Sequence, residues 1–290
     1  MSKFTDYGEN KLVDFIRGQT LTLPASWYFA LGNVADDTGF TEITGTNYAR
    51  VAVTRGLTQF SGTQGAGTTV ASTGTSHETR NNAAIAFPTA GAGGWTAATK
   101  VGIFDASTGG NCWAYGDLGS SVTVGSGSTY SLAISAAVFT IGLTGGMTDY
   151  LANKMVDLIW RAQAFTWPTV NAVRLVTTTP TNAAGGVEVS GGSYARVSIT
   201  PSLTSLSGTQ AAGSTVASTG TGGRTSNNAT LTFPTPTAAW GTVTHAEVLD
   251  SATLGAGNRL WWMPLGASKT ISLGALAPRF DANTLGFTFA

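Results

Sequence analysis

The chain carries one sequence pattern twice, and this repeat constrains its fold more than any other feature. The segment Glu42-Ile-Thr-Gly-Thr-Asn-Tyr-Ala-Arg-Val51 returns half a chain length later as Glu188-Val-Ser-Gly-Gly-Ser-Tyr-Ala-Arg-Val197. Three further segments repeat at the same spacing: Ser61-Gly-Thr-Gln64 as Ser207-Gly-Thr-Gln210, Val70-Ala-Ser-Thr-Gly-Thr75 as Val216-Ala-Ser-Thr-Gly-Thr221, and Phe87-Pro-Thr89 as Phe233-Pro-Thr235. A chain of 290 residues is long enough for two domains. We therefore predict two tandem homologous domains, over residues 1–144 and 145–290.

The composition favours a folded protein with a weakly charged surface. Only 10% of the residues are charged, and the 15 basic residues balance the 15 acidic ones. A disordered chain would combine high net charge with few aromatic residues, whereas 10% of this chain is aromatic. A protein without net charge or a basic run has little attraction for a phosphate backbone or an anionic membrane. We expect neither nucleic-acid binding nor membrane insertion.

The N-terminal residues and the cysteine content indicate the compartment of synthesis. The chain begins without the basic segment and apolar run of a secretory signal. Cys112 is the single cysteine, which excludes an intrachain disulfide. We expect synthesis in a reducing cytoplasm, and we interpret Cys112 as a small buried apolar residue rather than a nucleophile.

Each copy begins with a helical pattern and continues with short strands. Leu12, Phe15 and Ile16 fall on one face of a helix for which Asp6 can provide the N-cap, and residues 149–159 repeat the pattern. The remainder of each copy alternates short apolar runs with Gly, Ser, Thr and Asn turns. The expected fold is mainly β, with two tandem homologous antiparallel β-sandwich (jelly-roll-like) domains, each led by one short α-helix.

Two acid–base pairs recur in the repeated segment. Glu42 is matched by Glu188, and Arg50 is matched by Arg196. In each copy the carboxylate and the guanidinium can meet across a strand turn and fix the loop between them. We interpret both pairs as structural, because nothing in the sequence places two acids at one site for carboxylate-pair hydrolysis.

No pattern typical of catalysis or metal binding occurs in both copies. The two histidines, His77 and His245, lack a matching histidine in the other copy, and together with one cysteine they provide no metal-ligand spacing. A nucleophile elbow and a phosphate-binding loop are likewise missing from the sequence. We predict a protein that is not an enzyme, with no catalytic residues, no metal and no cofactor.

The aromatic residues raise the question of glycan binding, because Trp and Tyr rings stack on sugars. Trp113 and Tyr115 lie on one strand face, and Leu260 and Trp262 occupy the matching positions. Since leucine can replace tryptophan there, we interpret that face as core. Trp261 points the opposite way, and we predict it to be an exposed contact residue.

Together these segments resemble a small domain of tailed-bacteriophage tail fibre and minor structural proteins. In the first copy the resemblance is carried by Asp6-Tyr-Gly-Glu-Asn-Lys-Leu-Val-Asp-Phe-Ile-Arg-Gly18, Glu42 with Tyr48-Ala-Arg-Val51, Asn82-Ala-Ala-Ile-Ala-Phe-Pro88, Trp95 and Ile103-Phe-Asp-Ala106. In the second copy it is carried by Asp149-Tyr150, Val187-Glu188, Tyr194-Ala-Arg196, Asn228-Ala-Thr-Leu-Thr-Phe-Pro234, Trp240-Gly-Thr-Val243 and Val248-Leu-Asp250.

The resemblance implies a virion component, made in the host bacterial cytoplasm, with no catalytic residues to carry over. We expect a non-enzymatic tail fibre or tail-associated protein that mediates particle assembly and contacts the host. Its expected partners are other virion proteins and further copies of itself, with a trimer as one arrangement. Two alternatives remain open: a capsid decoration or cement protein that bridges shell subunits, and a module that binds a host-receptor glycan. Among enzymes, the alternative to be considered is a polysaccharide depolymerase.

Overall fold

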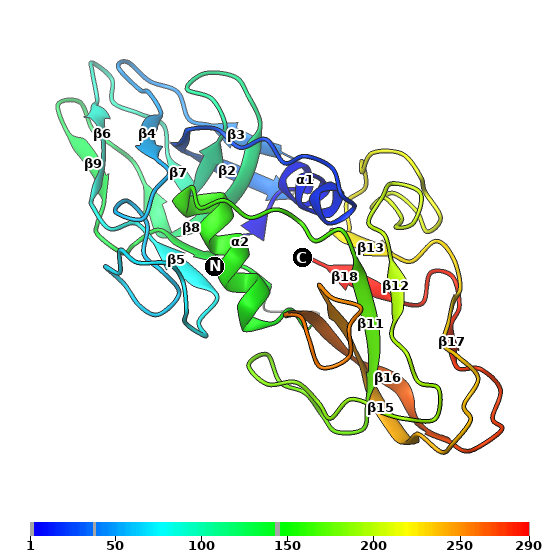
Figure 1. Ribbon diagram of the computed structural model, residues 1–290. Helices are drawn as coiled ribbons and strands as arrows, with labels where there is room; N and C mark the ends of the chain where they lie inside the picture. The colour runs from blue at the N-terminus through cyan, green and yellow to red at the C-terminus, as the bar shows by residue number, and fades with distance from the viewer. Residues whose placement is uncertain (1–2, 37–38, 143–145, 290) are drawn as a thin grey trace.

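The computed structural model describes residues 3–36, 39–142 and 146–289, and it shows a mainly antiparallel β protein in two parts (Figure 1). We call residues 3–142 the first half and residues 146–289 the second half. The boundary expected between residues 144 and 145 lies outside the described residues.

The first half contains one helix and a series of short strands. Its elements are β1 (Lys3–Phe4), α1 (Asp6–Ile16), β2 (Ser26–Asp36), β3 (Gly39–Glu42), β4 (Val51–Thr54), β5 (Glu78–Arg80), β6 (Ile85–Thr89), β7 (Ala98–Phe104), β8 (Cys112–Val122), β9 (Thr129–Leu132) and β10 (Val138–Thr140). The second half follows the same plan with α2 (Asp149–Arg161), β11 (Asn171–Val176), β12 (Val197–Ile199), β13 (Arg224–Ser226), β14 (Leu231–Thr232), β15 (Gly241–Leu249), β16 (Arg259–Ile271), β17 (Arg279–Phe280) and β18 (Gly286–Thr288).

The two halves share one sheet topology. In the first half four strands of the main sheet follow the order β4-β2-β7-β8, and in the second half the corresponding order is β12-β11-β15-β16. The first half adds β1 beside β8 and β3 beside β2. Two small antiparallel pairs accompany each main sheet, β5 with β10 and β6 with β9, then β13 with β18 and β14 with β17. This correspondence confirms the expected mainly-β fold and the duplicated domain.

Threonines cap both helices, and each cap also binds the sheet of its own half. The Thr5 hydroxyl oxygen accepts a hydrogen bond from the Gly8 amide at 3.3 Å, and Thr148 accepts one from Leu151 at 3.3 Å. Asp6 is therefore the first helical residue, and the expectation that it provides the cap was wrong. A threonine one residue earlier is equally able to accept this bond.

The two helices end differently. The α1 helix has 11 residues and stops at Arg17, before Gly18, which has a φ of +78°. The α2 helix has 13 residues and stops at Ala162, which adopts the left-handed conformation with a φ of +53°. A left-handed residue commonly ends a helix, and glycine occupies that position without the steric cost of a Cβ.

Each helix contributes an aromatic ring to the core of the opposite half. Trp160 of α2 stacks on Phe139 of the first half, with ring centroids 4.0 Å apart, and lies 5.5 Å from Trp27. Phe15 of α1 meets Trp167 of the second half edge-on at 5.6 Å. The apolar faces of both helices are thus covered from both halves, at the junction where the two halves meet.

Candidate functional site

The repeated Glu-to-Arg segment forms a rigid strand turn. In the first half Arg50 Nη2 lies 2.8 Å from Glu42 Oε2, so the structure brings the predicted pair together. Arg50 Nη1 also donates to the carbonyl oxygens of Ala106 and Gly109, both at 2.7 Å, and the guanidinium lies 3.6 Å from the centre of the Phe104 ring. The arginine therefore fixes the loop between β7 and β8.

The second half builds the same turn and extends it. Arg196 Nη2 lies 2.7 Å from Glu188 Oε2, and Arg174 Nη1 approaches the same oxygen at 3.2 Å. Arg174 continues to the fully buried Glu247, which also pairs with Arg259 at 2.8 Å. Burial raises the pKa of Glu188, but the hydrogen bond and charge of Arg196 and the charge of Arg174 outweigh it, so the pKa lies below 4.5.

The tyrosine of the repeated segment connects this turn to the main sheet. The Tyr48 hydroxyl accepts a hydrogen bond from the Leu31 amide at 2.8 Å and donates to the Leu31 carbonyl at 3.2 Å, while its ring meets Trp95 edge-on. Tyr194 takes the equivalent position beside Trp240. Burial raises the pKa of both hydroxyls, so both remain protonated at neutral pH. The Glu-Tyr-Arg positions thus serve architecture.

Trp261 is buried, which overturns its prediction as a surface contact. Only 1% of its surface is exposed, and its ring lies 5.1 Å from Phe287 and 5.7 Å from Trp167. Leu260, which points to the other face of β16, is also fully buried. Strand alternation separates the two faces of a sheet, but here both faces are covered, so neither position faces solvent.

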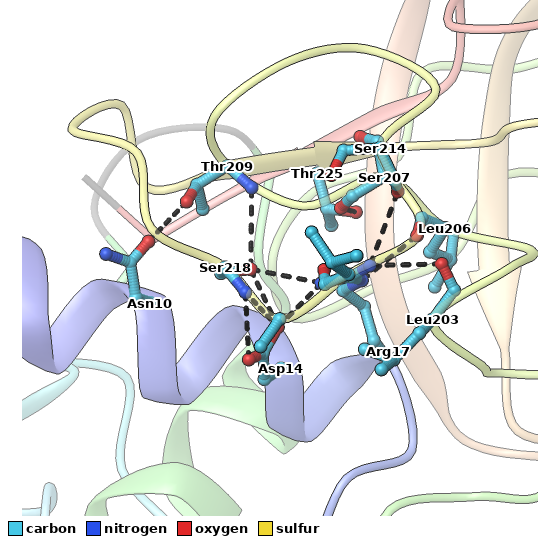
Figure 2. Close-up of polar contacts among 12 residues, drawn as sticks. Asn10, Asp14, Arg17, Leu203, Leu206, Ser207, Thr209, Ser214, Ser218 and Thr225 are labelled. Carbon is cyan, nitrogen blue, oxygen red and sulfur yellow. Dashed lines mark hydrogen bonds and ion pairs between the residues drawn. The ribbon is translucent and has the colours of Figure 1, made fainter.

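A more extensive set of contacts joins α1, which belongs to the first half, to a loop of the second half. Arg17 donates from Nε to the Leu206 carbonyl at 3.0 Å, from Nη1 to the Val216 carbonyl at 2.9 Å, and from Nη2 to the Leu203 carbonyl at 3.0 Å (Figure 2). Its Nη1 also pairs with Asp14 at 2.7 Å, although the Arg17 side chain is completely buried. A buried guanidinium is tolerated only when its donors are paired in this way.

Two further α1 residues bind the same loop. Both Asp14 carboxylate oxygens accept from the Ser218 amide, at 3.1 and 3.0 Å, and the Ser218 hydroxyl donates to Asp14 at 2.7 Å. Asn10 donates to the Gly220 carbonyl at 3.0 Å. It also accepts a hydrogen bond from the Thr209 hydroxyl (Figure 2). We call α1 with the loop 203–220 clasp 1.

The α2 helix makes the reciprocal contacts in the first half. Arg161 donates to the Phe60 carbonyl at 3.0 Å and to the Val70 carbonyl at 2.5 Å, and it pairs with Asp157 at 2.5 Å. Asp157 in turn accepts from the Ser72 amide at 2.9 Å and from its hydroxyl at 2.6 Å.

Asn153 completes this second set of contacts. It donates to the Gly74 carbonyl at 3.1 Å and accepts from the Thr63 hydroxyl, as Asn10 does with Gly220 and Thr209. We call α2 with the loop 60–77 clasp 2. Each half therefore contacts the other half's helix through the same kinds of atoms.

A comparison with protein families matches both halves separately. The family model described as "Podophage GP4 fiber I protein gp80" matches residues 3–140 and again residues 146–288. The chain belongs to this podophage fibre family. No curated protein matches the chain. The family match supports a phage structural role in the tail fibre class, and the two matches coincide with the two halves that the clasps join.

Sequence reasoning about this fibre-family chain found half of each clasp. The repeats at residues 61–64 and 70–75 mark the loop of clasp 2, and their counterparts mark the loop of clasp 1. The helical partners Asp14 and Asp157 were not predicted, because nothing local in the sequence indicates that a helical carboxylate meets a loop about two hundred or eighty residues away. The available signal was the Asn-x-x-x-Asp spacing, shared by Asn10 and Asn153 and followed in each helix by an arginine.

Clasp 2 has additional contacts that clasp 1 lacks. Arg55 of the first half donates from Nε to the Ile159 carbonyl at 2.8 Å, and the Trp27 indole donates to the same oxygen at 3.0 Å. These donors satisfy a carbonyl at the end of α2, where helix carbonyls have no partner within the helix. His77 Nε2 lies 2.6 Å from Asp149 Oδ1 at the start of α2. In the second half the residue corresponding to His77 is Gly223, which has a similar φ of +52°.

The remaining features of the fibre protein that bear on its class are the cysteine thiol, the possible metal ligands and the possible membrane-spanning helices. Burial raises the pKa of the Cys112 thiol to about 12, so the thiolate is scarce at neutral pH. Within residues 3–36, 39–142 and 146–289, no group of three His, Cys, Asp or Glu side chains could hold a metal ion. No helix in the same part of the chain is long and apolar enough to cross a membrane.

An open cleft of about 500 Å³ lies beside clasp 1. Its lining includes Tyr7 and Lys11 from α1, the segment 19–24, Asp105 from the loop between β7 and β8, and Trp113 from β8. Tyr7 is half-buried, with its ring edge-on to Trp113 at 5.4 Å. The cleft combines an accessible aromatic ring with charged and hydroxyl groups.

Proposed function

We propose that the chain is a non-enzymatic structural component of a podophage virion, located in the tail fibre apparatus, where it connects other virion proteins. The observation that carries the proposal is the fibre-family match over both halves. The proposed partners are tail proteins and further copies of the same chain, with a trimer as one candidate arrangement.

The residue chemistry supports an architectural role. The repeated charged residues of the chain form ion pairs that bind backbone carbonyls, as Arg50 does in a strand turn and Arg17 does in a clasp. Buried pairs of this kind favour a defined arrangement of neighbouring segments, although their net contribution to stability is smaller than their contact count suggests. A fibre component needs such a defined shape because it positions the neighbouring proteins relative to one another.

The experiment that tests this proposal is imaging of purified particles with bound Fab fragments raised against the purified chain. Labelling confined to the tail fibres supports the proposal. Labelling spread over the head would instead assign the chain to capsid decoration, and the proposed fibre location would be wrong. Complete particles that carry none of this chain would remove the virion assignment altogether.

Contact with a host glycan is a second candidate function, because the cleft beside clasp 1 offers the Tyr7 ring together with Lys11 and Asp105. Aromatic rings bordered by polar groups are suited to a sugar, which presents both apolar and hydroxyl surfaces. Binding of the purified chain to host envelope should fall at least tenfold in Tyr7→Ala. Tyr130, half-buried outside this cleft, provides the control Tyr130→Ala. Equal binding by both variants would exclude the cleft as the glycan-binding site.

A further inference from the structure

We propose that the clasps can act between molecules, so that the first half of one chain accepts the second half of another copy of the same chain. The interaction surface consists of the face of α1 that carries Asn10, Asp14 and Arg17, the loop 203–220, and their counterparts in clasp 2. The partner is a second copy of this chain. This inference goes beyond the proposed function and does not depend on where the chain sits in the particle.

The first argument is that the halves are joined by clasps and not by a shared sheet. Within the described residues, no strand or isolated bridge of one half pairs with a strand of the other. The β1 strand pairs with β8, and the equivalent bridge joins Met147 to Trp261, so the segment before each helix stays with its own half. Exchange of one half for another therefore requires no strand to leave a sheet.

The second argument is that each half contains both parts of the recognition. The first half offers α1 and the loop 60–77, and the second half offers α2 and the loop 203–220. This reciprocal pattern, in which each partner presents a similar patch to the other, resembles that of a symmetric dimer interface. The fibre protein carries the two partners on one chain, but the contacts themselves do not require that connection.

The third argument is that either half alone leaves a clasp incomplete. The Arg17 and Arg161 side chains are fully buried, and their acceptors outside their own helices all come from the opposite half. Without the loop of the opposite half, each guanidinium would lose most of its hydrogen-bond acceptors and would become exposed to solvent. A half that separates from its own partner is therefore complementary to the matching half of any other copy.

The contacts also specify that unlike halves pair. The first half receives Trp160 between Phe139 and Trp27, and His77 reaches Asp149. The α1 helix has no tryptophan next to its clasp arginine, since Ile16 precedes Arg17. A second copy of the first half would leave this aromatic pocket unfilled. The preferred partner of a first half is thus a second half.

The test uses the full chain with a protease recognition sequence placed between residues 142 and 146. The chain is purified intact, cut, and examined by size exclusion and native mass spectrometry. We expect the cut halves to remain paired at the mass of the uncut chain. When isotopically heavy and light cut samples are mixed, mixed pairs should approach about half of all pairs, because a half from either copy fits equally well.

Variants show whether the clasps carry this pairing. Asn10→Ala combined with Asn153→Ala removes two hydrogen bonds from each clasp without leaving a buried charge, and it should speed the exchange of halves at least tenfold. Arg17→Ala combined with Arg161→Ala should separate the halves. Arg279→Ala is the matched control, because Arg279 is 62% exposed and pairs with Asp281 outside both clasps. It should behave as the unmodified chain does.

Three results would overturn the inference. The first is separation of the cut halves of the unmodified chain. The second is pairing that persists while no mixed pairs form during prolonged incubation of the mixed samples. The third is an exchange rate in the Asn10→Ala/Asn153→Ala variant equal to that of the Arg279→Ala control, which would show that contacts outside the clasps hold the halves together.

Discussion

Two residue positions show how the same backbone requirement is met with different side chains in the two copies. The residue after the clasp arginine is Gly18 in the first copy and Ala162 in the second, and both adopt a positive φ. The left-handed conformation brings an alanine Cβ close to the backbone, at a cost of about 1 kcal/mol relative to glycine. Ala162 is held there by the helix that it ends.

Ala162→Gly should therefore stabilise the protein. We expect an increase of about 1 kcal/mol or less in the free energy of unfolding, measured by urea denaturation, because glycine also gains freedom in the unfolded chain. Gly18→Ala is the opposite change at the matching position, where a Cβ would lie 2.8 Å from the Pro201 carbonyl oxygen. It should be destabilising, and a loss of stability in both variants would show that Ala162 is not strained.

The pKa of Glu188 predicts a pH dependence that belongs to this single residue. Because its folded-state pKa lies below 4.5, its contribution to stability is present above the unfolded value and is lost as the pH falls through the folded value. The difference in unfolding free energy between the unmodified chain and Glu188→Gln should shrink as the pH is lowered below about 4.5. Asp281→Asn is the control, because both side chains of its pair with Arg279 are exposed and such a pair contributes little to stability. A constant difference for Glu188→Gln would contradict the assigned ion pairs.

At the scale of elements, the sequence was informative where partners are close along the chain. Glu42 and Arg50 lie within one strand turn, so their pairing could be predicted from spacing. Arg17 and Leu206 are almost two hundred residues apart, and a charged residue at a helix end is usually solvated, so nothing local indicated that contact. Trp261 shows the complementary failure: alternation assigns a strand face but does not reveal which faces are covered.

The duplicated fold was predictable for a physical reason. A repeat of strand and turn patterns over half the chain implies two copies of one topology, and the matching sheet orders agree. The contact of each helix with the opposite half was not predictable, because the same helix pattern would suit packing on either half. The repeat therefore predicts the shape of each domain, while the pairing of the domains depends on contacts between distant segments.

Coupling between Asp157 and Ser72 tests the clasp at this scale. Single changes Asp157→Asn and Ser72→Ala, together with the double variant, form a mutant cycle measured by urea denaturation. Because the carboxylate accepts a hydrogen bond from the Ser72 hydroxyl, which Ser72→Ala removes, we expect an interaction energy of about 0.5 to 3 kcal/mol. The cycle for Asp14 and Ser218 in clasp 1 should give a similar value. Additive effects in both cycles would contradict the clasp geometry.

At the scale of the whole molecule, the two clasps make each half depend on the other. Removing one partner of a buried ion pair commonly costs about 3 to 5 kcal/mol, because the remaining groups stay buried without it. Damage to α1 of the first half should thus weaken the second half, across a large distance in sequence. This dependence distinguishes two clasped domains from two domains that are merely connected.

The most direct test of this account is hydrogen exchange measured by mass spectrometry on Arg17→Ala. We expect amide protection to fall in the loop 203–220, where Arg17 binds the carbonyls of Leu203, Leu206 and Val216, while the loop 60–77 of clasp 2 keeps its protection. Loss of protection confined to α1 and its own half, with the loop 203–220 unchanged, would contradict the reciprocal clasps on which the account rests.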